Sequence, residues 1–133
     1  MGVGMPADLY LEEFGYQLYA AFGKMVYHVG SSVFGKSWRD VDVRVLLPDE
    51  EYEAMGLGDP ANPHANAKWV SLVLAYSALG KAMTGLPIDF QIQQQSYANE
   101  RYSQNEKHVR SALGVFSRLR WQNLMKKERE AEE

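Results

Sequence analysis

Apolar and polar residues recur along the chain with two different periods, and the longer period predicts three helices. Across Ala7–Phe22 the apolar positions follow helical spacing, and acidic residues lie near the first turn. A second helical pattern covers Trp69–Met83 and is ended by Gly85. The C-terminal segment, about 111–133, is expected to form a helix from near Gly114 whose last residues fray.

The shorter period, an alternation of polar and apolar residues, predicts strands. Asp40–Leu47 and Ile88–Gln93 each alternate, so each segment has an apolar face to bury and a polar face. The shorter stretch Lys24–Val29 is rich in β-forming residues and is ended by Gly30. Three strands are therefore expected.

The remaining segments are predicted to be loops. Pro48–Pro63 is rich in Gly, Pro, Asn and Asp, with room for one helical turn around Glu50–Met55. The stretch after Gln93, up to about Arg110, shows no usable periodicity. The order of elements predicts an α+β fold of two layers, in which a small mixed β-sheet of three or more strands packs against helices.

Length and composition narrow the class of protein. A chain of 133 residues, 46% apolar, can close one hydrophobic core, so a single domain spanning 1–133 is expected. The absence of cysteine excludes disulfides, thiolate zinc sites and thiol nucleophiles. No stretch approaches the roughly 18 apolar residues of a membrane span, so we expect a soluble, cytoplasmic protein.

The net charge of -3 conceals a basic segment between Arg101 and Arg129. That segment contains eight Lys or Arg and two acids. It could contact phosphates, or it could be an ordinary solvated helix face. The three histidines, His28, His64 and His108, lack metal-type spacing and are expected to be structural or on the surface.

Three aspartates form the strongest chemical pattern. Asp40 and Asp42 are two positions apart in one predicted strand and so share a face. Asp89 lies on the polar face of another predicted strand. If these strands are neighbours, three repelling carboxylates meet, and a divalent cation is the usual remedy. Two such ions, roughly 3.5 to 4 Å apart, could clamp the oxygens of a phosphoryl displacement.

The residues before this strand add a second feature. Gly30 and Ser31 come at a predicted strand end, where a glycine lets the backbone approach a triphosphate. Lys36, Arg39 and Arg44 flank the two acids and could neutralise charge on a transferred phosphoryl group. Arg44 is preferred because it shares their strand face, although a structural ion pair with one of the aspartates is the alternative.

These motifs together resemble the polymerase-beta-like nucleotidyltransferase superfamily. The resemblance covers Val29 to Gln93: glycine-serine, a spacer, Asp-Val-Asp-Val, and later a strand with an aspartate between apolar residues. The segments GSSVFGKSWRDVDVRVLL and LPIDFQIQ are similar to small nucleotidyltransferase-like proteins of tailed phages, notably actinobacterial ones. A phage origin would place the protein in the host cytoplasm.

The resemblance implies roles for individual residues. Asp40 and Asp42 would bind both metal ions, Mg²⁺ or Mn²⁺, and Asp89 would complete one site and help activate the acceptor hydroxyl. Gly30 with Ser31 and Ser32 would hold the phosphates of a nucleoside triphosphate. The reaction would transfer a nucleoside monophosphate to an unidentified acceptor (RNA, protein or small molecule) and release pyrophosphate. Base preference and oligomeric state stay open.

Three other readings compete. Gly30–Ser37 (GSSVFGKS) matches the P-loop pattern G-x-x-x-x-G-K-S/T, but a P-loop lysine opens a helix, whereas a strand is predicted three residues after Ser37. A degenerate member of the superfamily would bind nucleotide or a partner without catalysis. On an exposed strand Asp-x-Asp can also be two solvated acids. A third acid in another alternating strand favours the catalytic reading.

Overall fold

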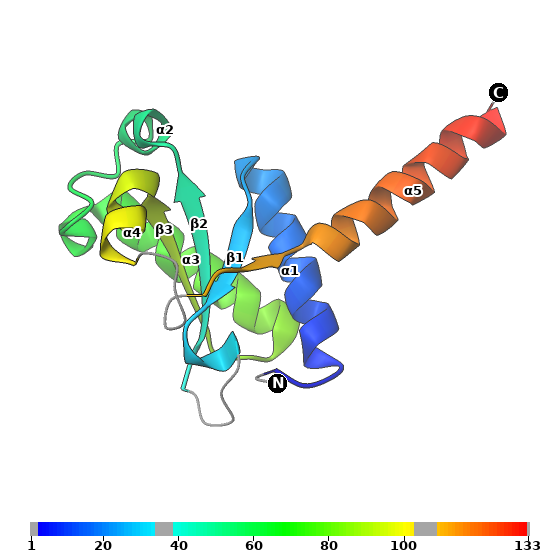
Figure 1. The fold of residues 1–133 in the computed structure, drawn as a ribbon, viewed down its shortest axis with the longest axis horizontal. Helices are drawn as coiled ribbons and strands as arrows, with labels where there is room; N and C mark the ends of the chain where they lie inside the picture. Colours follow the sequence, from blue (N-terminus) through cyan, green and yellow to red (C-terminus); the bar gives the residue numbers. More distant parts are fainter. Residues whose placement is uncertain (1–2, 34–38, 103–108, 133) are drawn as a thin grey trace.

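A computed structural model describes residues 3–33, 39–102 and 109–132 of the chain (Figure 1). Its helices and strands, in chain order, are α1 (Ala7–Phe22), β1 (Val26–Val29), β2 (Val41–Leu47), α2 (Asp49–Ala54), α3 (Ala67–Thr84), β3 (Ile88–Gln94), α4 (Gln95–Arg101), β4 (Ser111–Leu113) and α5 (Val115–Glu132). Short 3-10 turns lie at Ser31–Val33 and Pro63–Ala65.

The strands form one mixed sheet in the order β3-β2-β1-β4. β2 and β3 are parallel, whereas β1 is antiparallel to both β2 and β4. Helices α1 and α3 lie together against the sheet and make the second layer (Figure 1). The α+β fold with a small mixed sheet is therefore confirmed.

The hydrophobic core lies between the sheet and these two helices. Val41, Val43 and Val45 of β2 are fully buried, as the alternation predicted. From the helices, Phe14 and other apolar side chains meet them. Close packing is possible because α3 has a glycine at position 80, where a Cβ would come within 2.9 Å of both Phe14 and Ile88. The opposite, polar face of the sheet does not pack against these two helices.

Most predicted elements agree with the structure. α1 occupies Ala7–Phe22, the predicted range. α3 begins two residues before Trp69 because the side chain of Asn66 caps it, accepting a 2.9 Å hydrogen bond from the Trp69 N–H. It ends at Gly85, which has φ 73°. The turn expected around Glu50–Met55 is the short helix α2.

The segment after β3 was predicted as a loop up to about Arg110, and this is wrong where the helix α4 forms. The edge strand β4 lies just beyond it, in the segment 111–133 that was assigned to the C-terminal helix. α4 begins with Ser96 bonded to Asp49: the Ser96 N–H and hydroxyl donate to that carboxylate at 3.1 and 2.5 Å. β4 is only three residues long and is defined by its pairing with β1. Both elements depend on partners distant in sequence, so local periodicity did not indicate them.

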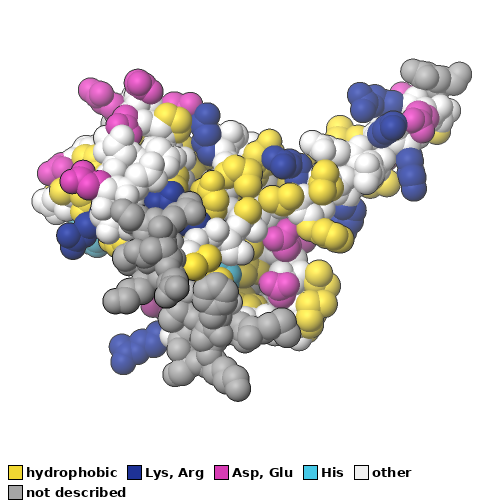
Figure 2. Space-filling model, in the orientation of Figure 1, with side chains coloured by type: hydrophobic (Ala, Val, Ile, Leu, Met, Phe, Trp, Pro, Cys, Tyr) yellow, Lys and Arg dark blue, Asp and Glu magenta, His cyan; other side chains and the backbone are white. Residues whose placement is uncertain are grey.

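The C-terminal helix α5 extends away from the body of the molecule (Figure 1). Its beginning is fixed to α1, because the Gly114 N–H donates a 3.1 Å hydrogen bond to Glu12 and the Ser117 hydroxyl a 3.2 Å bond to Glu13. Hydrophobic side chains are visible along it where it leaves the body (Figure 2). None of the helices described is long and apolar enough to cross a membrane.

Candidate functional site

The polar face of the sheet brings Asp42 and Asp89 side by side. β2 and β3 run parallel, and Asp42 is the register partner of Asp89. Register partners in adjacent strands project from the same face, and this face is opposite to the one formed by Val41 and Val43. Two of the three predicted carboxylates therefore meet.

Asp40 lies at the edge of this pair. It precedes β2, is exposed, and is close enough for its charge to act on Asp42. Within the described ranges, no three His, Asp or Glu side chains are grouped so that they could hold a metal ion. The expected cluster of three is thus a facing pair, Asp42 and Asp89, with Asp40 outside it.

Arg44 is bound beneath the two facing carboxylates. Its Nη1 donates to the main-chain oxygens of Asp89 at 2.6 Å and Val43 at 3.1 Å. Its Nη2 lies 3.7 Å from Asp42 Oδ1 and 3.6 Å from Asp89 Oδ2. The Arg44 side chain is only 12% exposed. The alternative reading of this arginine, a structural ion pair, is what the structure shows, with both aspartates rather than one.

One guanidinium does not compensate all the negative charge here. Burial raises the pKa of Asp42, and the neighbouring charges of Asp89 and Asp40 raise it further, while Arg44 lowers it. A side-chain hydrogen bond with Asp89 raises the pKa of Asp42 as well. The pair therefore favours a proton or an additional cation.

Gly30 brings the end of β1 directly against Asp42. Its φ is 79°, a conformation that residues with a side chain rarely adopt, and a Cβ at this position would collide with Asp42 Oδ2. The 3-10 turn Ser31–Val33 follows, with the Val33 N–H bonded to the Gly30 oxygen at 3.3 Å. The predicted juxtaposition of a glycine turn and an acidic strand is present.

The serines and basic residues predicted around this turn differ from one another in burial. Ser32 is fully buried, and its hydroxyl is 2.6 Å from His28 Nε2, so it holds the turn from inside. Burial lowers the pKa of His28. Arg39 is exposed just before β2. The side chain of Ser31 and the whole of Lys36 lie outside the described part of the structure.

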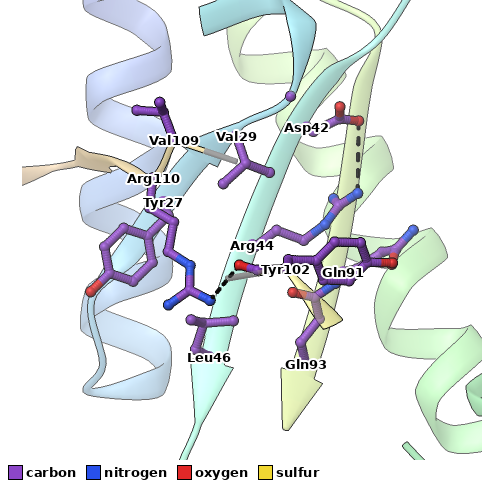
Figure 3. Close-up of a pocket in the computed structure, with 11 residues that line it drawn as sticks. Tyr27, Val29, Asp42, Arg44, Leu46, Gln91, Gln93, Tyr102, Val109 and Arg110 are labelled. Atoms are coloured by element: carbon purple, nitrogen blue, oxygen red, sulfur yellow. Dashed lines mark hydrogen bonds and ion pairs between the residues drawn. The ribbon is translucent and has the colours of Figure 1, made fainter. Parts of the chain in front are cut away.

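A cavity of about 280 Å³ opens next to the Asp42–Arg44 pair (Figure 3). It is lined by Tyr27, Val29, Gly30, Asp42, Arg44, Leu46, Gln91, Gln93, Tyr102, Val109 and Arg110. Asp42 and Arg44 lie at the Gly30 end of the cavity, whereas the Arg110 guanidinium lies near Leu46, among aromatic, apolar and amide groups (Figure 3). Such a mixture suits a small ligand with a charged end and a planar or apolar end.

Several lining residues were not identified from the sequence. Tyr27 and Val29 alternate with the buried Val26 in β1, so their polar-face position could have been found from the strand pattern. Tyr102 follows the end of α4, and Arg110 precedes β4, so neither lies in a helix or strand with a readable pattern. They are placed by contacts: Arg110 donates to Asn99 Oδ1 at 2.9 Å and to the Tyr102 main-chain oxygen at 3.4 Å, and Figure 3 draws the second of these bonds.

A divalent cation suits the donor set that is present. Mg²⁺ is commonly bound through one or two carboxylates, with water and substrate phosphate oxygens completing the coordination. Asp42 and Asp89 supply two carboxylates: Asp42 lines the cavity, and the side-chain exposures of 24% and 35% leave both carboxylates accessible to solvent. A third protein ligand is therefore not required for such a site.

The P-loop pattern lacks its helix in the described residues. A helix opened by Lys36 and Ser37 would continue through Arg39 and Val41. Instead, Arg39 lies in a bend and Val41 begins β2. The aspartate pair, rather than the GSSVFGKS segment, is the better candidate centre.

No family model, no characterised protein and no solved structure matches this chain. The resemblance described from the sequence stays a prediction, carried by residues 29–93.

Proposed function

We propose that the chain is a metal-dependent nucleotidyltransferase that moves a nucleoside monophosphate from a nucleoside triphosphate to an acceptor hydroxyl and releases pyrophosphate. The observation that supports this most is the pairing of Asp42 with Asp89 beside the Gly30 turn, at one end of a cavity. Neighbouring carboxylates next to a glycine turn fit a cation and the phosphates that accompany it.

The cation, Mg²⁺ or Mn²⁺, would be held by Asp42 and Asp89, with the charge of Asp40 acting on Asp42 from outside the pair. When bound, it neutralises negative charge on the phosphates. Asp89, the more exposed of the pair, would also accept a hydrogen bond from the acceptor hydroxyl and so orient its oxygen toward the α-phosphorus. The new bond joins that oxygen to phosphorus, the hydroxyl proton would pass to Asp89, and the bond from phosphorus to pyrophosphate breaks.

The cavity can divide the substrate between its two ends. Phosphates would lie near the Gly30 turn, where the backbone can come close because no Cβ intervenes. Tyr27, Leu46 and Val109 offer apolar surface for the nucleoside, and Gln93 offers amide groups to a base. Binding by fixed groups on strands would align the α-phosphorus with the acceptor.

The proposal is tested by incubating the protein with each labelled triphosphate, Mg²⁺ or Mn²⁺, and RNA, protein or small-molecule acceptors. We expect Asp42→Asn and Asp89→Asn each to lower transfer by about a hundredfold or more. Glu50→Gln is the control, because it removes a carboxylate from exposed α2, outside the cavity. Transfer that survives both aspartate substitutions would refute the catalytic assignment.

One observation favours a second candidate, a nucleotide-binding or partner-binding module without catalysis. Arg44 already partly neutralises the carboxylates that would hold the cation. This candidate predicts that triphosphate binds with measurable affinity while no acceptor is ever labelled. Equilibrium dialysis with labelled triphosphate, run beside the transfer assay, separates the two.

A further inference from the structure

We propose that Arg44 is a built-in competitor for the divalent cation: its guanidinium holds Asp42 and Asp89 in the cation-free protein, and cation binding must overcome this contact. The inference rests on the proposed function in one respect, that a divalent cation binds these two carboxylates. It adds a restraining role for an arginine that sequence reasoning took for a phosphate ligand.

The contacts of Arg44 differ in kind. The bonds from Nη1 to the main-chain oxygens of Asp89 and Val43, at 2.6 and 3.1 Å, anchor the guanidinium to the backbone. The contacts from Nη2 to the two carboxylates, at 3.7 and 3.6 Å, are longer than a hydrogen bond and act through charge. Main-chain oxygens thus fix the position of the Arg44 guanidinium, and its charge acts on the two carboxylates.

A divalent cation needs the same carboxylate oxygens. Because the Arg44 side chain is only 12% exposed and tied to the backbone, its positive charge is poorly screened by water. A cation binding these carboxylates therefore meets a fixed positive charge at close range. The two cations oppose each other, so binding of one weakens the hold of the other on Asp42 and Asp89.

The nearby cation Arg110 provides the matched comparison. It lines the same cavity, yet its guanidinium is bonded to Asn99 Oδ1 and the Tyr102 oxygen, and no ion pair with Asp42 or Asp89 is found for it in the described structure. Removing the charge of Arg110 should change the electrostatic field in the cavity, but the contacts of Arg44 with Asp42 and Asp89 should remain. Arg44→Lys provides the second comparison, because it keeps a charge and loses the planar fork.

The experiment measures Mn²⁺ affinity by isothermal calorimetry without nucleotide, so no turnover is involved. Arg44→Gln should bind Mn²⁺ about tenfold more tightly than wild type or better. Arg44→Lys and Arg110→Gln should stay within about threefold of wild type. Equal or weaker binding by Arg44→Gln, or no binding by either wild type or Arg44→Gln, would overturn the proposal.

A measurement on the wild-type chain covers the case in which Arg44→Gln does not fold. Titration with Mg²⁺ followed by ¹H–¹⁵N NMR should shift the Nε resonance of Arg44 more than that of Arg110. An unmoved Arg44 resonance at saturating Mg²⁺ would also overturn the inference. Failure of nucleotidyl transfer would leave both results standing, because the transfer assay and these measurements report different events.

Discussion

Gly30 directly follows β1 and lies against Asp42 of β2. The backbone of Gly30 has φ 79°. Gly30→Ala should destabilise the protein through two effects. An alanine in this conformation costs about 1–2 kcal/mol, and its Cβ would press on the Asp42 carboxylate. The midpoint and slope of urea unfolding measure the loss.

Gly56→Ala is the matched control for this substitution. Gly56 has φ 71°, yet a Cβ there meets no atom within 4 Å. It carries the conformational cost alone, so Gly30→Ala should lose more stability and also weaken cation binding. Equal losses for the two variants, with cation affinity unchanged, would show that the Gly30–Asp42 contact does not matter.

The ionised Asp42 carboxylate is expected to lower the free energy of unfolding, although transfer activity requires it. Its pKa is raised in the folded protein, so the folded state binds more protons than the unfolded state between the ordinary value of 3.8 and the raised value. Stability therefore falls as pH rises through that window, and the loss remains at neutral pH. Asp42→Asn should be more stable than wild type at pH 7 while losing transfer activity.

The pH dependence of this difference checks its cause. Urea unfolding of wild type and Asp42→Asn at several pH values should show the advantage of the variant shrinking as pH falls through the raised pKa and below 3.8, where the wild-type carboxyl becomes protonated in both states. A variant less stable than wild type at pH 7 would mean that the contact with Arg44 outweighs burial.

Site residues on alternating strands could be predicted from the sequence. Site residues positioned by a particular side-chain contact could not. The common face of Asp42 and Arg44 follows from period two, and Asp89 meets them because β3 pairs in phase with β2. The inward hydroxyl of Ser32 depends on His28 four residues earlier, which no spacing rule indicates. The three-carboxylate cluster became a pair because Asp40 precedes the strand rather than lying within it.

At the scale of elements, α5 depends on α1 for its first turn. The Gly114 N–H, just before the helix, donates to Glu12 at 3.1 Å, and the Ser117 hydroxyl donates to Glu13. Glu12→Ala leaves a helix-start donor without its acceptor and should cost about 1 kcal/mol in urea unfolding. Glu12→Gln retains an acceptor oxygen and should lose less, so equal stability of both variants and wild type would contradict this role.

The long periodic elements, and the short elements β1 and α2, were predicted from the sequence within about two residues, whereas β4 and α4 were not. α1, α3 and the strands β2 and β3 carry enough turns or alternations to bury a face, and that burial determines them. β4 has three residues and exists because β1 offers a free edge. α4 begins where Asp49, the first residue of α2, binds Ser96. These are tertiary effects, which a local pattern does not contain.

At the scale of the whole molecule, two surfaces are not packed against α1 and α3 in the described structure. They are the polar face of the sheet and most of the helix α5. The sheet face holds the candidate site. The helix α5 is exposed at every residue from Leu119 to Glu132, although its ring contact between Trp121 and Tyr16, with centroids 6.4 Å apart, reaches back to α1. Stability should therefore be distributed unevenly.

Hydrogen exchange tests this distribution, because α5 and α3 have the same length of 18 residues but different surroundings. α3 packs on α1 and β3, so its central amides should exchange only by global unfolding. In α5, a helix end beyond Trp121 has no packed face, and an isolated segment shorter than about 12–15 residues is marginal in water. Amides 124–132 should exchange nearly as fast as in an unstructured peptide. Protection equal to that of α3, unchanged on dilution, would mean that α5 is held within a single chain by contacts other than those with α1.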